Sequence, residues 1–282
     1  MQLPLERVTF CRNNKNHFFP EITNHVIFYK LTGMDMDDWQ KKIVIKTGSK
    51  GQLIVDSTNG YDINPKDFCL HSKSNHDDEG SHKLSSPKVL YLIISNHTRM
   101  EAAMRESIRS TWSTDVNKTL SDNHKVLFFV GRTKTSENNR DNEYNAKVVE
   151  EAKIYNDIVK TDIEEFDTQY YMKQTFSMLS WMYKYCELAR FVVKTTSNTY
   201  VNLETLEKFA EQEMFAANRI YGSILKRMMP DRQIGGIHQI SEEEWPWDYL
   251  PPFLKDPTFV MSGDVVPRLL LGNLKLHCKD VQ

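Results

Sequence analysis

The sequence predicts an α/β fold in which a mainly parallel central sheet is covered by helices on both faces. Short apolar runs, of which residues 89–95 (VLYLIIS) are the clearest, have the continuous hydrophobic character of strands buried on both sides. Segments with helical spacing of apolar residues alternate with these runs after residue 87. Such alternation is typical of parallel sheets built from strand–helix–strand units.

The predicted elements follow one another in a regular order along the second half of the sequence. Strands are expected at residues 89–95, 125–131, 158–159 and 191–194, and helices at residues 100–112, 143–155 and 170–189. In parallel sheets, ligands bind beyond the carboxyl ends of the strands. The polar turn that follows the strand at 191–194 is therefore a candidate site.

The chain divides by composition into three parts. Residues 1–68 are expected to form an irregular, stem-like extension in which 26–29 and 43–45 could be strands. Residues 69–86 are rich in Ser, His and Asp and predict an exposed polar linker. Residues 87–282 are expected to form the main domain.

Composition restricts the possible functions. Basic and acidic residues nearly balance, 36 against 38, so no bulk charge favours nucleic acid or an anionic membrane surface. The N-terminus has no apolar core of signal-peptide length, and no stretch approaches the about 20 apolar residues of a spanning helix. Neither a signal nor an anchor is visible in this chain.

Cysteines and glycosylation triplets bear on the cellular compartment. The four cysteines include no C-x-x-C pair of the kind that zinc sites use. Buried free thiols and one disulfide in a lumenal protein are both compatible with them. Asn96 and Asn117 each begin an N-x-T triplet and are candidate glycosylation sites, although such triplets are weak signals by themselves.

Four segments, taken together, resemble the family of Golgi β-1,3-galactosyltransferases and β-1,3-N-acetylglucosaminyltransferases. They occur in the family's order and at its spacing. The segments are residues 105–112 (RESIRSTW), 151–159 (EAKIYNDIV), 175–202 (ending in FVVKTTSNTYVN) and 244–264 (EWPWDYLPPFLKDPTFVMSGD).

The resemblance implies a GT-A-like fold and inverting transfer of galactose or N-acetylglucosamine from a UDP-sugar donor to a glycan hydroxyl. It also implies a type II protein of the Golgi membrane and a domain that is incomplete at its C-terminus. Two readings of function follow from the residues. The chain is a hexosyltransferase, or it is a non-catalytic relative that binds a glycan, a nucleotide or a partner glycosyltransferase.

Family members hold manganese with a D-D-D or D-x-D motif at a strand end. Here Thr196, Ser197 and Asn198 occupy the acidic positions, between Lys194-Thr195 and Tyr200-Val201-Asn202. Hydroxyl and amide oxygens bring no charge to offset the dehydration of a divalent cation. The sequence therefore predicts that manganese is absent or weakly bound.

The resemblance also assigns candidate site residues. On the donor side these are Arg105, Arg109, Lys194, Thr196, Ser197 and Asn198, and on the acceptor side Trp245, Asp248, Tyr249 and Asp264. For the two arginines, a surface ion pair is as plausible as contact with a diphosphate. Asp280 is the candidate catalytic base, and Cys69 and Cys186 are the candidate disulfide.

Overall fold

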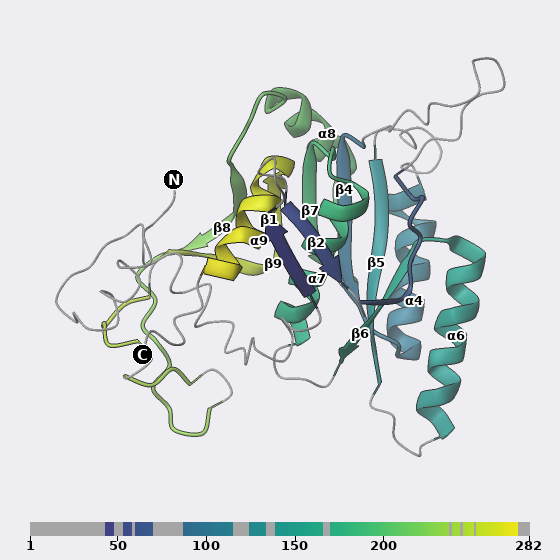
Figure 1. The fold of residues 1–282 in the computed structure, drawn as a ribbon, viewed down its shortest axis with the longest axis horizontal. Helices are drawn as coiled ribbons and strands as arrows, with labels where there is room; N and C mark the ends of the chain where they lie inside the picture. Colours follow the sequence, from purple (N-terminus) through teal and green to yellow (C-terminus); the bar gives the residue numbers. More distant parts are fainter. Residues whose placement is uncertain are drawn as a thin grey trace.

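A computed structural model describes the chain in several ranges. They are residues 43–47, 53–57, 60–69, 87–114, 124–133, 139–165, 170–236, 239–242, 245–250 and 252–275. Within them the strands form a seven-stranded sheet in the order β3-β6-β5-β4-β7-β9-β8 and a separate two-stranded sheet, β1-β2 (Figure 1).

The larger sheet has a parallel centre and antiparallel flanks. Its strands are β3 (Tyr61–Ile63), β4 (Val89–Ser95), β5 (His124–Arg132), β6 (Ile158–Glu164), β7 (Phe191–Thr196), β8 (Ile220–Leu225) and β9 (Phe253–Ser262). β4 runs parallel to both β5 and β7, and β5 runs parallel to β6. β3, β8 and β9 pair antiparallel with their neighbours. The small sheet joins β1 (Ile43–Thr47) to β2 (Leu53–Ser57).

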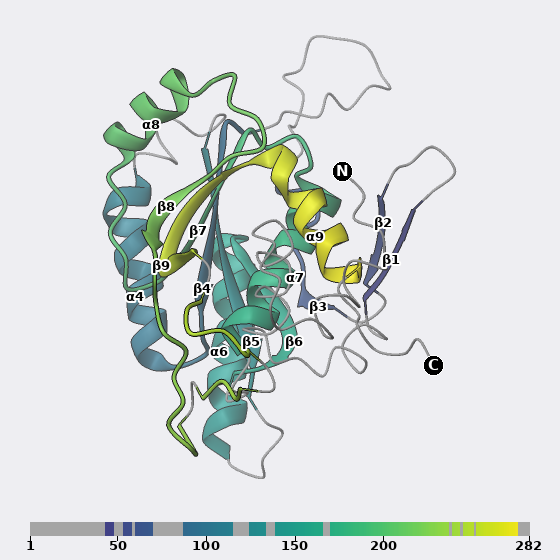
Figure 2. The same cartoon turned by 90° about the vertical axis from the view of Figure 1, so that its left-hand side faces the viewer.

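Helices cover both faces of this sheet, as predicted (Figure 2). They are α4 (Arg99–Ser110), α6 (Asn139–Tyr155), α7 (Tyr170–Tyr185), α8 (Leu203–Gln212) and α9 (Val266–Lys275), with the 3-10 turn η1 (Gly263–Val265) before the last. α7 and α9 pack on one face and α4, α6 and α8 on the other, so two hydrophobic clusters sandwich the sheet. Among the described helices, none has the length and apolar character needed to span a bilayer.

The predicted strands and helices of the parallel core are confirmed, with shifted ends. β6 is longer than the predicted pair 158–159, and α7 ends at Tyr185 rather than at residue 189. β8 and β9 were not predicted, because Gly222 and Ser223 interrupt the apolar residues of β8, and the first half of β9 contains lysine, aspartate and proline. The predicted strand at 26–29 lies outside the described residues.

Residues 60–69 belong to the sheet and to the core, so the folded unit starts before residue 87. β3 pairs with β6, and the Tyr61 hydroxyl donates to the Ser177 carbonyl, 3.0 Å away. The polar stretch 70–86 lies outside the described residues.

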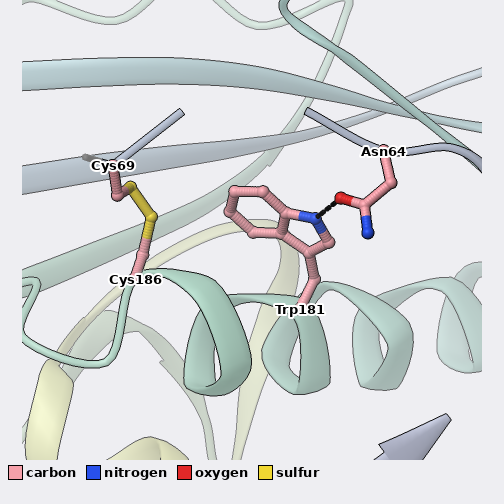
Figure 3. The surroundings of a disulfide bond; sticks show 4 residues. All are labelled: Asn64, Cys69, Trp181 and Cys186. Atoms are coloured by element: carbon pink, nitrogen blue, oxygen red, sulfur yellow. Dashed lines mark hydrogen bonds between the residues drawn. A yellow bond between two sulfur atoms is a disulfide. The ribbon is translucent and has the colours of Figure 1, made fainter. Parts of the chain in front are cut away.

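The predicted disulfide between Cys69 and Cys186 is confirmed. The two Cα atoms lie 5.6 Å apart, and the bond joins the segment after β3 to the end of α7. One turn earlier in this helix, the fully buried Trp181 donates its indole N–H to Asn64 Oδ1 at 2.7 Å (Figure 3). A covalent bond and a hydrogen bond thus fix residues 60–69 on α7.

A buried histidine network joins β5 to α8. His124 is fully buried, and its Nε2 lies 2.5 Å from Glu207 Oε2, while Tyr91 Oη lies 2.9 Å from Nδ1. Burial lowers the pKa of His124, although the hydrogen bond to Glu207 opposes this shift. In the folded state the imidazole therefore resists protonation.

We expect this network to make the fold sensitive to mild acid. The unfolded chain binds a proton at His124 near pH 6.5, whereas the folded chain binds it only at lower pH. Stability should therefore fall as the pH drops below about 6.5 towards the folded pKa. Urea unfolding of the wild type and of His124→Asn between pH 7.5 and 5 measures this, and the variant should show the flatter profile. An equal slope in both proteins would contradict the prediction.

Candidate functional site

A pocket of about 430 Å³ opens at the carboxyl ends of β4 and β7. Parallel α/β sheets bind ligands at this edge. The lining residues come from the ends of the two strands, the first turns of α4 and α7, and β9. They are Ile94, Ser95, Asn96, Glu101, Tyr170, Tyr171, Lys194, Thr196, Ser197, Asn198 and Pro257. The pocket therefore brings together four of the six predicted donor-side residues.

The turn between β4 and α4 forms one wall of the pocket. Asn96 Oδ1 accepts hydrogen bonds from Thr98 N at 3.0 Å and from Thr98 Oγ1 at 2.7 Å. Thr98 is the N-cap of α4, and its Oγ1 accepts from Glu101 N at 3.4 Å. Acidic side chains are stabilised near the positive end of a helix, which suits Glu101 in the first turn.

The turn after β7 forms the opposite wall, and its polar side chains bond largely to one another. Thr196 Oγ1 donates to Asn198 Oδ1 at 2.6 Å, and Ser197 N donates to the Ile94 carbonyl at 3.1 Å. Asn202 then caps α8 by accepting from Thr205 N at 2.9 Å. The uncharged sequence TTSN thus forms a compact, hydrogen-bonded turn.

Glu101 is a pocket residue that sequence reasoning missed. Its Oε2 accepts from Ser95 Oγ at 2.8 Å and from Ser197 Oγ, so it joins the ends of β4 and β7. Glu101 is the only carboxylate that lines this pocket in the described part of the chain. The sequence does indicate where Glu101 lies along the chain. Thr98 to Glu101 follows the T-x-x-E pattern of a capping box, which predicts a helix start and places Glu101 in its first turn.

Lys194 and Tyr170 complete the inner part of the pocket. Lys194 is 4% exposed, and its Nζ lies 5.5 Å from the centre of the Phe259 ring. The hydroxyl of the buried Tyr170 donates to the Ser95 carbonyl at 2.6 Å, and burial raises the pKa of this phenol. The pocket therefore combines one cation, one carboxylate and several neutral hydroxyls.

Arg105 and Arg109 both form ion pairs, but these are buried and not at the surface as the alternative expected. Arg105 is fully buried, and its guanidinium binds Glu151 through Nε at 2.9 Å and Nη2 at 2.6 Å. Its Nη1 donates to Ser95 Oγ and to the Asn96 carbonyl at 2.8 and 2.7 Å. Arg105 thus fixes Ser95 and Asn96, which line the pocket, but does not line the pocket itself.

Arg109 lies one turn further along α4, away from the pocket. It binds Asp157 through Nε at 2.8 Å and Nη2 at 2.9 Å, and Glu151 through Nη1 at 2.7 Å. Burial alone would raise the pKa of Glu151, but hydrogen bonds from Arg105 and Arg109 hold it below its usual value. The two arginines and two carboxylates form one network between α4 and α6.

The predicted acceptor-side residues do not gather at the pocket. Trp245 is buried and donates its indole N–H to the Tyr249 carbonyl at 3.0 Å, while Asp248 and Tyr249 are exposed. Asp264 follows β9, where Ser262 pairs with the first residue of β7. The Asp264 carboxylate accepts from Asn218 N at 2.8 Å and does not line the pocket.

A comparison with protein families adds an independent observation. The family described as Galactosyltransferase matches residues 103–280 of this chain, more than half of its length. The chain belongs to the galactosyltransferase family. Its mixed sheet with a parallel centre and flanking helices is consistent with the GT-A-like fold that the sequence resemblance implied.

Individual relatives are named as β-1,3-galactosyltransferases. The chain is 27% identical over 184 residues to β-1,3-galactosyltransferase 5 of Homo sapiens, covering 65% of this chain and 56% of that protein. It is 26% identical over 201 residues to β-1,3-galactosyltransferase 1 of Mus musculus, covering 69% and 58%. The chain spans less than three fifths of the length of these two relatives.

The pocket residues of this family member do not fit manganese. A divalent cation at this strand end would meet hydroxyl and amide oxygens and one carboxylate, Glu101, whose Oε2 already accepts two hydrogen bonds. Among the described residues, no group of three His, Cys, Asp or Glu side chains could hold a metal ion. A hard cation needs more charged oxygen ligands than these.

Two predicted features of this chain lie outside the described residues, the candidate base Asp280 and the glycosylation triplet at Asn117. The other triplet, at Asn96, lies in the pocket wall. The stretch 254–258 lies inside β9, where Pro257 lines the pocket and Thr258 Oγ1 lies 2.7 Å from Thr195 Oγ1.

Proposed function

We propose that this chain binds a UDP-sugar in the pocket at the ends of β4 and β7 and transfers its hexose to a glycan hydroxyl with inversion. The observation that carries the proposal is the pocket itself. It lies at the strand ends where α/β sheets bind nucleotides, and Thr196, Ser197 and Asn198 line it. The names of the relatives support galactose as the sugar.

Lys194 supplies the positive charge that this chemistry requires. In the transfer, the acceptor hydroxyl oxygen bonds to the anomeric carbon, the bond from that carbon to the diphosphate oxygen breaks, and UDP leaves with the electron pair. The hydroxyl proton passes to a base, for which Asp280 is our candidate. A fixed lysine offsets the charge of the leaving diphosphate without any step through a metal ion.

Replacing Lys194 by methionine should therefore weaken UDP binding about tenfold to a hundredfold, because one charge-assisted contact is lost. Methionine keeps most of the side-chain volume and its packing near Phe259. Calorimetric titration with UDP measures the effect, and Lys153→Met, on the exposed side of α6, is the matched control. Equal UDP affinity in the wild type and in Lys194→Met would exclude Lys194 from the site.

A second candidate function is non-catalytic binding of a nucleotide, a glycan or a partner glycosyltransferase. The observation in its favour is the replacement of the acidic motif by Thr196, Ser197 and Asn198, which removes the usual charge from the strand end. Transfer from UDP-galactose to a glycan acceptor, measured with EDTA and with titrated manganese, separates the candidates. Turnover in EDTA supports the transferase, and binding without turnover supports the second candidate.

We also propose that the protein resides in the Golgi membrane system, as the family resemblance implies. The Cys69–Cys186 disulfide supports a lumenal location for the domain, because such bonds persist in oxidising compartments. Immunofluorescence of the full-length gene product against a Golgi marker tests this. A diffuse cytosolic signal would contradict it.

A further inference from the structure

We propose that Glu101 is a ligand-binding residue that accepts a hydrogen bond from a hydroxyl of the bound sugar nucleotide. The inference rests on the proposed function and adds a contact for the same pocket. The structure points to Glu101 because it brings a carboxylate into a pocket whose other polar groups are hydroxyls, amides and one lysine.

The two oxygens of Glu101 have different surroundings. Oε2 accepts from Ser95 at the end of β4 and from Ser197 at the end of β7, which fixes the carboxylate between the two strands. Oε1 accepts no hydrogen bond from any residue that the structure describes. A carboxylate held by one oxygen presents the other in a defined direction, which is the preorganisation that a binding site requires.

The negative charge of this oxygen determines which group of the ligand it can bind. An ionised carboxylate accepts hydrogen bonds and donates none, so it binds hydroxyl groups and repels phosphate oxygens. A UDP-sugar carries both, with its diphosphate between two polyol rings, the ribose and the hexose. Lys194 and Glu101 in one pocket would therefore bind different parts of the ligand, Lys194 the diphosphate and Glu101 a ring hydroxyl.

The direction in which a substitution changes the affinity for each ligand separates ligand binding by Glu101 from a purely structural role. Glu101→Gln keeps the shape and an oxygen that can accept from the serines, but it removes the negative charge. If Glu101 binds a hydroxyl, the variant should bind UDP-galactose about tenfold or more weakly. The same variant should bind inorganic pyrophosphate, which has no polyol, as well as the wild type or better, because a repelling charge is gone.

The experiment is calorimetric titration of wild type and Glu101→Gln with pyrophosphate, UDP and UDP-galactose. Weaker binding of both UDP and UDP-galactose identifies a ribose hydroxyl, and weaker binding of UDP-galactose alone identifies a hexose hydroxyl. Retained pyrophosphate binding shows that the variant is folded. Glu106→Gln, an exposed glutamate on the same helix, is the matched control.

Two results would overturn the inference. If Glu101→Gln binds UDP-galactose as tightly as the wild type, Glu101 only joins the strand ends, and the proposed function stands without it. If the wild type binds none of the three probes, the proposed function and the inference fail together. A supporting variant is Ser197→Ala, which removes one of the two bonds that orient Oε2 and should cause a smaller loss for the same ligands that Glu101→Gln weakens.

Discussion

Replacing Arg105 by leucine is expected to lower the free energy of unfolding by about 3–5 kcal/mol. The substitution leaves the Glu151 carboxylate without its bidentate partner and removes donors from Ser95 Oγ and the Asn96 carbonyl. Breaking a buried ion pair by removing one partner is costly, and the Glu151 charge would then be compensated only in part, by Arg109 Nη1 at 2.7 Å. Equilibrium urea unfolding measures the change.

Arg132→Leu is the matched control for this prediction. The Arg132 side chain is 44% exposed and lies 3.5 Å from Glu164, so its loss should change stability by about 1 kcal/mol or less. If Arg105→Leu were as stable as the wild type and instead lost UDP binding, Arg105 would be a donor contact. The ion-pair interpretation would then be wrong.

Removing the disulfide through Cys69→Ser and Cys186→Ser should cost about 4–5 kcal/mol of stability. The bond closes a loop across a sequence separation of 117 residues, and a long loop gives the unfolded chain more freedom to regain. Thermal unfolding of the double variant, compared with the wild type without reducing agent, measures the effect, and the wild type in reducing agent should behave like the variant. A wild type whose stability is the same with and without reducing agent would contradict it.

The parallel core could be predicted from the sequence because its strands are buried on both faces. All seven residues of β4 are buried, so apolar side chains appear without interruption. β8, in contrast, is a mostly exposed edge strand, and β9 contains lysine, aspartate and proline, so neither carries a recognisable period. β3 has only three residues and depends on its pairing with β6.

The sequence predicted where the candidate site lies, but not all of the residues that line it. The turn at Thr196 was found because a polar run follows a buried strand, and topology placed it at the ligand-binding edge. Glu101 lies 95 residues before Thr196, and only the parallel pairing of β4 with β7 brings the two together. The acceptor-side assignment of Trp245, Asp248, Tyr249 and Asp264 rests on the family resemblance alone, and none of the four lines the pocket.

We propose above all that the pocket binds a UDP-sugar through Lys194 without a divalent cation. Calorimetric titration of the wild type with UDP-galactose, once in EDTA and once in manganese, tests it most directly. We expect UDP-galactose to bind saturably in EDTA, with an affinity that manganese leaves unchanged within error. Binding that is absent in EDTA and appears only with manganese at micromolar concentration would contradict it.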